Sequence, residues 1–306
     1  MSPVPTIKLN NGVEVPSIGL GCWSGNSDEE RAAGVSWMIT AIQQGYKHFD
    51  TAAGYGTEPT LAKAIKETGV KREDLFITTK LAWDEPHDVQ GAFAQSLKNL
   101  NTDYVDLYLV HWPFTVIRGP DGKEVKTADG DLAAQDKPNF QDTWVEVEKI
   151  YASGKAKAIG VSNFSIKTLE QLLTTAKVIP AVNQVELHPY LAQPELKAYC
   201  ESKGIALTAY TPTGYGTVRS DATIGSLAEK YKVQPAQIIL AWHGKRGVIV
   251  VPKSSSAEHQ KENLNLPTLS DEDFATISNL DRNQRLCNKA NERGIVWAWT
   301  YEQLGW

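Results

Sequence analysis

The sequence has few cysteines, no long apolar run and no leader-like N-terminus. Cys22, Cys200 and Cys287 are an odd number in 306 residues and show no CxxC spacing, which argues against a disulfide framework. No apolar run approaches the roughly 20 residues that a membrane-spanning helix needs. Residues 1–12 lack the charged and apolar regions of a signal peptide. We therefore expect a cytoplasmic protein with no membrane partner.

Metal-ligand motifs are also missing. The histidines show no HxH or HExxH pairing; they are His48, His87, His111, His188, His243 and His259. Metal-dependent hydrolysis, a chemistry that barrel proteins also perform, normally requires such pairs. We therefore expect no metal ion.

Charge of either sign is not concentrated anywhere in the chain. There are 31 Lys and Arg against 36 Asp and Glu, so the formal net charge is -5, spread without long runs. A distribution of this kind provides no basic surface for nucleic acid, and we expect no such partner. Nothing marks a self-complementary apolar face, so both a monomer and a dimer remain open.

Strand-like and helix-like segments alternate along the chain. A hairpin is predicted over residues 6–15, with Asn11-Gly12 as its turn. The predicted strands are 17–20, 47–50, 75–80, 105–111, 156–161, 181–186, 206–210 and 247–250. The predicted helices are 28–44, 57–67, 89–100, 139–152, 166–174, 193–202, 224–242 with a break near Pro235, and 257–263. Eight strand–helix units at this length predict an α/β fold, a (β/α)8 TIM barrel, as a single domain over residues 1–306.

Two segments stand outside this alternation. They are a polar insertion over residues 113–138, after the fourth strand, and the tail after about residue 280. Barrel enzymes build their sites from loops at the C-terminal ends of the strands. We therefore expect the insertion and the tail to cover that end of the barrel.

Four polar residues lie at or just after the ends of three neighbouring predicted strands. Asp50 ends the second strand, Tyr55 lies in the loop after it, Lys80 ends the third and His111 ends the fourth. The same ends of parallel strands meet at one rim, so these side chains should converge. Taken singly, Asp50 could cap a turn, Lys80 could be solvated, His111 could be a core histidine and Tyr55 a surface aromatic.

The combination has a coherent chemistry. A tyrosine has a pKa of about 10 and donates protons slowly unless a neighbour raises its acidity. An ammonium from Lys80 would lower that pKa, Asp50 would keep Lys80 charged, and His111 could align a carbonyl oxygen. Such a set suits a reaction in which a hydride reaches a carbon while the oxygen takes a proton from Tyr55.

Tryptophan is over-represented, with nine in the chain. Trp23, Trp83, Trp112, Trp297 and Trp299 stand near predicted strand ends. Ordinary packing would explain any one of them. Together they favour an aromatic pocket for a planar or apolar ligand.

Several motifs in this order resemble the aldo-keto reductase superfamily, in the branch of aldose, xylose and related fungal reductases. GYKHFDTAAGYGTE at 45–58, ITTKL at 77–81 and DLYLVHWP at 106–113 match the catalytic segments. GKAKAIGVSNF at 154–164, VNQVELHPY at 182–190 and VPKSSSAEHQKEN at 251–263 match the cofactor segments. The resemblance covers almost the whole chain.

The resemblance implies a role for each matching residue. Tyr55 would be the general acid, tuned by Lys80 and Asp50, with His111 orienting the substrate. The implied cofactor is NADPH, with NADH possible. Its nicotinamide would be held by Ser162, Asn163, Gln184 and Tyr210, and its adenosine side by Lys253, Ser254, His259, Glu262 and Asn263.

The resemblance also places the pocket aromatics, at Trp23, Trp112 and Trp299, with Trp83 and Trp297 adding to the wall. It implies reduction of a small aldehyde, an aldose or a sugar acid to the alcohol. Arg118 and Arg293 lie on candidate loops, although neither is clearly placed for a substrate carboxylate.

Two positions depart from the pattern. His259 stands where the family usually has an arginine against the 2′-phosphate, and histidine is mostly neutral at pH 7, which makes use of NADH plausible. The loop at 214–220 is shorter than in many relatives, which predicts faster cofactor release.

Two other functions compete with a reductase. Tyr151 and Lys155 have the YxxxK spacing of short-chain dehydrogenases, but the glycines at 19–25 lack the dinucleotide-binding spacing. The alternative from another class is a regulatory protein that binds the cofactor with little turnover. All four catalytic candidates are present, which favours the enzyme.

Overall fold

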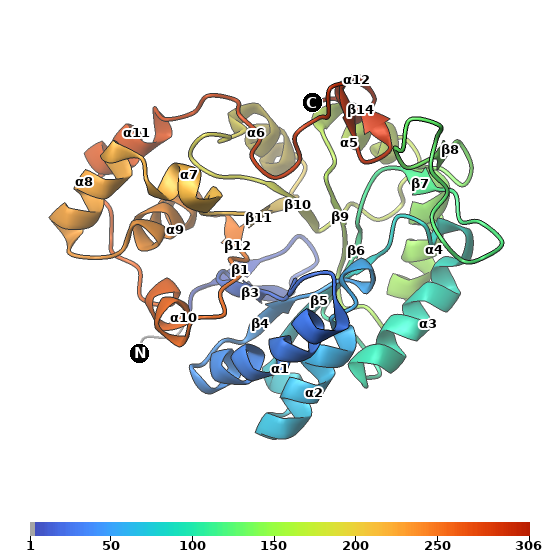
Figure 1. Ribbon diagram of the computed structural model, residues 1–306, viewed down its shortest axis with the longest axis horizontal. Helices are drawn as coiled ribbons and strands as arrows, with labels where there is room; N and C mark the ends of the chain where they lie inside the picture. Colours follow the sequence, from blue (N-terminus) through green and yellow to red (C-terminus); the bar gives the residue numbers. More distant parts are fainter. Residues whose placement is uncertain (1–3) are drawn as a thin grey trace.

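The computed structural model describes residues 4–306, and residues 1–3 of the expected 1–306 domain lie outside the described part (Figure 1). Within residues 4–306 one sheet has eight parallel strands, which neighbour one another in sequence order. They are β3 (Gly19–Gly21), β4 (His48–Asp50), β5 (Phe76–Leu81), β6 (Leu107–Val110), β9 (Ile159–Ser162), β10 (Val182–Glu186), β11 (Ala206–Tyr210) and β12 (Ile249–Val250).

The two edges of the sheet meet and close it into a barrel. Ile18 forms a parallel bridge with Val250, and the Val250 N–H donates to the Ser17 carbonyl at 2.9 Å. The predicted (β/α)8 barrel is confirmed. Strand bounds differ from the predicted ones by three residues at most, because apolar runs continue past the paired residues.

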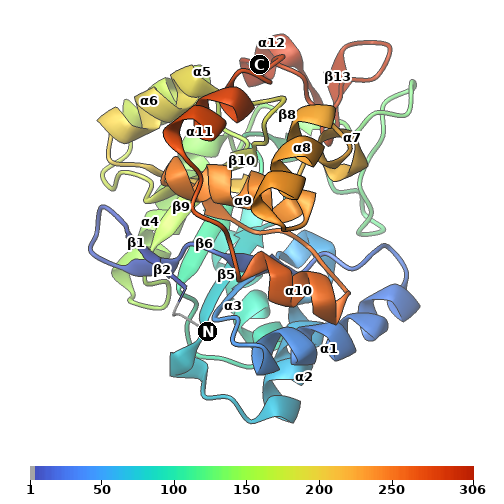
Figure 2. The ribbon, with the colours of Figure 1, turned by 90° about the vertical axis from the view of Figure 1, so that its left-hand side faces the viewer.

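Helices surround the barrel (Figures 1 and 2). They are α1 (Asp28–Gln43), α2 (Glu58–Thr68), α3 (Val89–Leu100), α4 (Phe140–Ala152), α5 (Ile166–Leu173), α6 (Pro194–Ser202), α8 (Ala222–Tyr231), α9 (Pro235–Lys245), α10 (Ala257–Asn263) and α11 (Asp271–Ser278). Side chains fix several starts: Ser27, Asn139 and Ser165 each form a capping box with the residue three positions on. The predicted break near Pro235 is confirmed, because α9 begins at this proline, where the missing N–H costs nothing.

The N-terminal hairpin is present as well. Strands β1 (Thr6–Lys8) and β2 (Glu14–Pro16) pair antiparallel around Gly12, whose φ of 88° favours glycine. Leu9 and Val15 of the hairpin are buried in a cluster with barrel residues such as Phe76 and Leu107. The hairpin therefore packs on the barrel's interior side chains near the strand starts.

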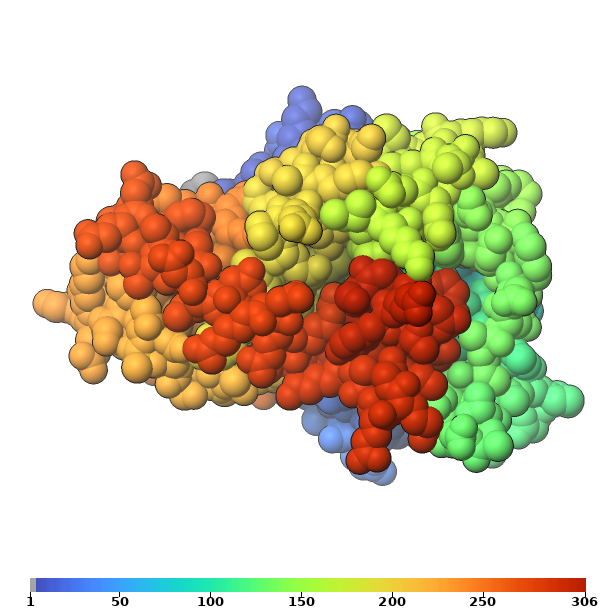
Figure 3. Space-filling model, turned by 90° about the horizontal axis from the view of Figure 1, so that it is seen from above, coloured from blue at the N-terminus to red at the C-terminus, as the bar shows by residue number. Residues whose placement is uncertain are grey.

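The insertion and the tail pack against each other at the opposite end. The insertion forms β7 (Thr115–Val116) and β8 (Ala134–Gln135), and the tail forms β13 (Ile295–Val296), β14 (Trp299–Thr300) and α12 (Tyr301–Leu304). They share an apolar cluster, and the Leu132 N–H donates to the Trp297 carbonyl at 3.1 Å. Figure 3 shows the tail, in red, crossing this face beside the green insertion. The predicted cover is confirmed.

Three helices were not expected, and α12 of the tail is one of them. The short loop at 214–220 contains α7 (Tyr215–Arg219), which begins after Gly214 in the left-handed region at φ 60° and is held by the buried Val218. Helix α11 carries only Phe274 and Ile277 toward the core, too few apolar positions for its period to stand out in the sequence. None of the helices that the structure describes is long and apolar enough to cross a membrane.

Candidate active site

Asp50 and Lys80 form a buried ion pair at the ends of neighbouring strands β4 and β5. The Lys80 ammonium donates to Asp50 Oδ1 at 2.6 Å and to the Thr51 carbonyl at 2.9 Å, and its side chain is fully buried. Burial favours the neutral amine and so lowers the pKa of Lys80. The attraction to Asp50, with a smaller contribution from Tyr55, is larger, so the net pKa is raised. Lys80 is therefore a charged ammonium inside the barrel.

Tyr55 lies next to the ammonium of this pair. It ends a short 3-10 helix, η1 (Ala53–Tyr55), which Gly56 terminates in the left-handed conformation. The Lys80 Nζ is 4.9 Å from the centre of the Tyr55 ring. Burial raises the pKa of Tyr55, while Lys80 opposes that rise. The effect of Lys80 has the direction that the sequence predicted, but the net pKa is raised, because desolvation of the phenol is the larger effect.

His111 follows β6 and faces both Tyr55 and an indole. Its ring centre is 5.5 Å from that of Tyr55 and 5.5 Å from that of Trp83. Burial, with a smaller contribution from Lys80, holds the pKa of His111 well below its usual value, so the imidazole is neutral. Its Nδ1 is buried without a partner in residues 4–306. The four predicted catalytic residues are thus brought together at one rim.

A second group of predicted residues lies on or just after β9, β10 and β11. The Tyr210 hydroxyl donates to Asn163 Oδ1 at 2.7 Å, and Asn163 Nδ2 donates to the His111 carbonyl at 3.0 Å. Ser162 Oγ donates to the Gln184 carbonyl at 2.8 Å. These contacts link the second group to the backbone of the first.

This group suits a carboxamide. Gln184 Nε2 donates to Asp50 Oδ2 at 2.7 Å, and within residues 4–306 its Oε1 makes no hydrogen bond. An amide with two N–H donors could use that oxygen, and the half-buried ring of Tyr210 lies beside Asn163 for a planar partner. The residues present therefore fit a nicotinamide.

The residues predicted for the adenosine side lie around α10. Lys253 is exposed, its Nζ is 5.6 Å from the ring of Trp37, and it has no ion pair in the described chain. His259 is also exposed, whereas Ser254 and Asn263 are buried. Glu262 lines an open cleft of about 490 Å³ together with the start of α9. An exposed lysine that has no carboxylate partner in the described chain can bind an anionic phosphate on the adenosine side.

The four candidate catalytic residues and the segment that carries Lys253 lie at the same ends of the strands. Gly21 of β3 pairs with Asp50, and a Cβ on Gly21 would lie 2.8 Å from the Val251 carbonyl and 3.5 Å from the Lys253 nitrogen. The chain can pass this close only because residue 21 has no side chain. Gly21 therefore joins the rim that holds the four candidate residues to the segment that carries Lys253.

The aromatic residues divide into two sets. Trp83 contacts His111 and stacks on Trp297 at 6.0 Å between ring centres. Trp112 stacks on Phe114 at 5.2 Å, and Phe114 contacts Trp299 at 5.7 Å. Within residues 4–306 Trp23 joins neither set and is 49% exposed.

Sequence reasoning missed several residues near this end. Trp306 packs on Trp112 with ring centres 5.9 Å apart, and Arg285 lies over Trp306 at 3.5 Å. Glu186 is also buried here, and its place two residues after Gln184 on one strand, hence on the same face, was a usable signal. No sequence signal marked Asn288.

Both arginines of the candidate loops have carboxylate partners. Arg118 pairs with Asp84, and Arg293 donates to Asp131 at 2.6 Å. Their charges are thus compensated within the protein. No group of three or more His, Cys, Asp or Glu in the described part of the chain could hold a metal ion.

Comparison with known proteins identifies the family of this chain. The profile of the Aldo/keto reductase family matches residues 17–282. The chain belongs to this family. It is 42% identical over 286 residues to the Saccharomyces cerevisiae protein named glycerol 2-dehydrogenase (NADP(+)), which covers 90% of each chain.

Two other relatives match the chain over a similar length. An aldehyde reductase of Saccharomyces cerevisiae is 42% identical over 287 residues, covering 90% of this chain and 91% of its own. The glyoxal reductase of Bacillus subtilis is 40% identical over 286 residues, covering 92% and 94%. As an aldo/keto reductase, this protein is an oxidoreductase that acts on carbonyl groups.

Proposed function

We propose that this aldo/keto reductase reduces a small aldehyde, aldose or sugar acid to the alcohol with NADPH, and that Tyr55 is the proton donor. The observation that carries the proposal is the stacked arrangement of Asp50, Lys80 and Tyr55 beside a neutral His111. A phenol above a buried ammonium, at the C-terminal rim of a barrel, is suited to proton donation.

The bound cofactor would supply a hydride to the carbonyl carbon. Tyr55 then gives its phenolic proton to the carbonyl oxygen, which becomes the alcohol. The tyrosinate that remains is stabilised by the Lys80 ammonium, because opposite charges attract strongly in a desolvated site. Water subsequently returns a proton to Tyr55, so protons and electrons balance over the cycle.

His111 has a different task. Because its ring is neutral, a proton on Nε2 lets it donate a hydrogen bond without competing with Tyr55 as the acid. A hydrogen bond to the carbonyl oxygen would hold that oxygen in line with the phenol. We assign His111 to substrate orientation.

Asn163 and Gln184 would hold the nicotinamide carboxamide with Ser162, and Tyr210 would stack on its ring. Lys253 would bind the adenosine-side phosphate, with Ser254, His259, Glu262 and Asn263 around it. The unpaired charge of Lys253 supports NADPH. His259 lacks the permanent fork-shaped charge of arginine, so use of NADH is part of the proposal.

The substrate class rests on the aromatic walls and on the relatives. Trp83 contacts the ring of His111, and Trp112, which follows His111 in the sequence, is linked to Trp299 through Phe114. The relatives are named for glycerol, an aldehyde and glyoxal. The carboxylate partners of Arg118 and Arg293 favour uncharged members of this class over sugar acids. Of the expected pocket residues, Trp23 has the weakest support.

The test follows loss of reduced-nicotinamide absorbance with NADPH and NADH, across a panel of aldehydes, aldoses and uronic acids. Tyr55→Phe should lower kcat by roughly 10²-fold or more, since a general acid contributes about 10²–10⁴-fold, while cofactor binding is kept. Tyr199→Phe, which removes the hydroxyl of a tyrosine on α6, is the matched control. Full activity in Tyr55→Phe would defeat the mechanism. Cofactor binding without any wild-type turnover would favour a regulatory protein instead.

A further inference from the structure

Asn288, in the tail, joins two side chains that belong to different parts of the site. Its Nδ2 donates to the Tyr210 hydroxyl at 2.5 Å, and its Oδ1 accepts from Trp297 Nε1 at 3.1 Å. Tyr210 in turn donates to Asn163. The three hydrogen bonds run in one direction, from Trp297 through Asn288 and Tyr210 to Asn163. In such a series each hydrogen bond polarises the next.

Further contacts connect Asn163 back to Trp297 by way of His111 and Trp83. Asn163 donates to the His111 carbonyl, the His111 ring contacts Trp83, and Trp83 stacks on Trp297. Trp297 therefore contacts the catalytic histidine's neighbour on one side and Asn288 on the other. A shift of Asn288 changes both the cofactor-side residues and this aromatic wall.

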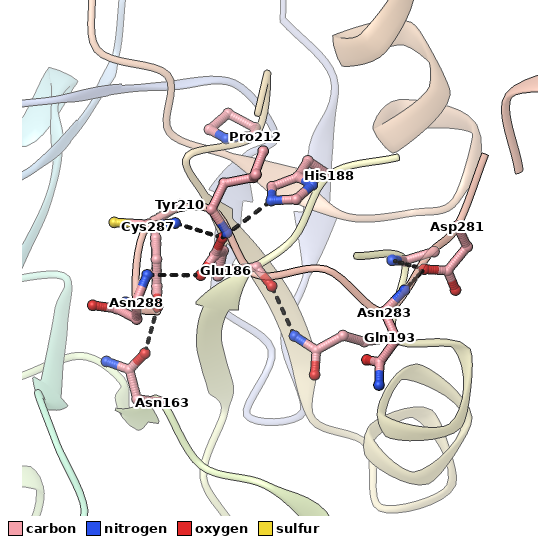
Figure 4. Close-up of polar contacts among 12 residues, drawn as sticks. Asn163, Glu186, His188, Gln193, Tyr210, Pro212, Asp281, Asn283, Cys287 and Asn288 are labelled. Atoms are coloured by element: carbon pink, nitrogen blue, oxygen red, sulfur yellow. Dashed lines mark hydrogen bonds and ion pairs between the residues drawn. The ribbon is translucent and has the colours of Figure 1, made fainter. Parts of the chain in front are cut away.

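Glu186 holds the segment that carries Asn288 in place. Its buried carboxylate accepts the backbone N–H groups of Leu286, Cys287 and Asn288 at 2.5, 2.8 and 3.2 Å, and it contacts His188 Nε2 at 3.1 Å. Figure 4 shows this cluster between the strand ends and the tail. Burial alone would raise the pKa of Glu186, but these donors lower it. The segment is thus anchored through its backbone, which leaves the Asn288 side chain free to link its neighbours.

Trp297 is held against its own backbone preference. Its φ is 59°, a region that a bulky residue rarely adopts, and its side chain is 53% exposed. Little packing fixes this indole, so the hydrogen bond from Nε1 to Asn288 and the stack on Trp83 determine where it lies. Strained residues of this kind persist only where the surroundings hold them.

We propose that Asn288 is a positioning residue that fixes the positions of Tyr210 and Trp297 relative to each other. The position of Trp297, and of the aromatic wall it forms with Trp83, then depends on whether a nicotinamide lies against Tyr210. The proposal rests on the proposed reductase function. It assigns to Asn288 no contact with reacting atoms. It predicts that a cofactor against Tyr210 and Asn163 orders the tail through Asn288.

The test compares Asn288→Ala, Trp297→Phe and the double variant. Glu292→Gln is the control, at an exposed tail residue whose side chain forms no hydrogen bond or ion pair in the described chain. Asn288→Ala should raise the KM for the aldehyde about tenfold while kcat changes less than about threefold, as the loss of a hydrogen bond to a partly buried partner implies. Trp297→Phe, which removes the indole N–H but keeps an aromatic ring, should do the same. The double variant should be no worse than Asn288→Ala, because both changes cut one chain of contacts.

A second measurement does not depend on turnover. Amide hydrogen exchange over residues 286–298 should slow when NADPH is added to the wild type, and this slowing should be lost in Asn288→Ala but kept in Glu292→Gln. Additive effects in the double variant, or an NADPH response that survives in Asn288→Ala, would overturn the proposal. A wild type without turnover whose tail still responds through Asn288 would defeat the proposed function but support the positioning role.

Discussion

Gln184 donates its side-chain amide to one oxygen of Asp50 at 2.7 Å, while the other oxygen of Asp50 binds Lys80 at 2.6 Å. One buried carboxylate therefore serves both a residue proposed to hold the nicotinamide and the ammonium beneath Tyr55. The two contacts come from strands on different sides of the barrel, β10 and β5. Because Asp50 has both oxygens engaged, its removal affects the cofactor side and the acid together.

Asp50→Asn should destabilise the protein by about 3–5 kcal/mol, because it leaves the Lys80 ammonium buried without its counter-charge. The double variant Asp50→Asn/Lys80→Met, which removes both charges, should recover much of that loss. Urea unfolding of the wild type and of the three variants, including Lys80→Met alone, measures it. If the double variant were as unstable as the sum of the singles, the two side chains would not act as a pair.

The rate of reduction should not fall near pH 6.5 through protonation of His111, because burial keeps the pKa of this imidazole well below that value. The alkaline limb should come from Tyr55, which must be protonated to act. Since its pKa is raised, kcat/KM should stay level through neutral pH and fall only above about pH 10. Initial rates between pH 5.5 and 10.5 check this, with KM separated from kcat. An alkaline fall that begins near pH 7 would contradict the raised pKa.

His243 should make the protein less stable in acid. It lies buried on α9, and burial, with a smaller effect of Arg246, lowers its pKa to about 3. In the unfolded chain the pKa is about 6.5, so below that pH the unfolded state binds a proton that the native state does not. Stability therefore falls as the pH drops from 6 to 4, by at most about 1.4 kcal/mol per pH unit from this group.

The matching variant is His243→Gln, which keeps a donor for the Pro212 carbonyl that accepts from Nε2. Its free energy of unfolding, measured in urea at pH 4, 5 and 6, should fall less steeply than that of the wild type. Equal slopes would show that His243 does not contribute to acid sensitivity.

His259→Arg should shift cofactor use toward NADPH. His259 is exposed on α10, its backbone N–H donates to Ser256 Oγ, and its imidazole makes no hydrogen bond within residues 4–306. An arginine there would add a permanent charge that can bind a phosphate through two parallel hydrogen bonds, raising the NADPH to NADH ratio of kcat/KM about tenfold. Glu258→Gln is the control, because it changes the charge of α10 by the same amount without placing a guanidinium. An equal shift in both variants would attribute the effect to net charge alone.

Much of the barrel could be predicted from the sequence, for a local reason. Short apolar segments such as 206–210, separated by helical periods, determine strands buried on both faces, and eight of them determine the closed sheet. The convergence of Asp50, Lys80 and His111 followed in turn, because corresponding ends of parallel strands meet. The family motifs indicated the carbonyl chemistry before any contact was known.

Other features were decided only by the tertiary structure. The net pKa of Tyr55 depends on how much of the chain covers it, and the availability of Arg118 and Arg293 depends on carboxylates that distant loops bring to them. Asn288 reaches Tyr210 across 78 residues of sequence, and Gln184 reaches Asp50 across 134. Hydrophobic periodicity specifies which face of a segment is buried, but not which side chain from another segment will meet it there. The sequence by itself therefore determined the barrel and the rim of candidate catalytic residues, whereas the charge balance and the contacts between the tail and the site arose from packing.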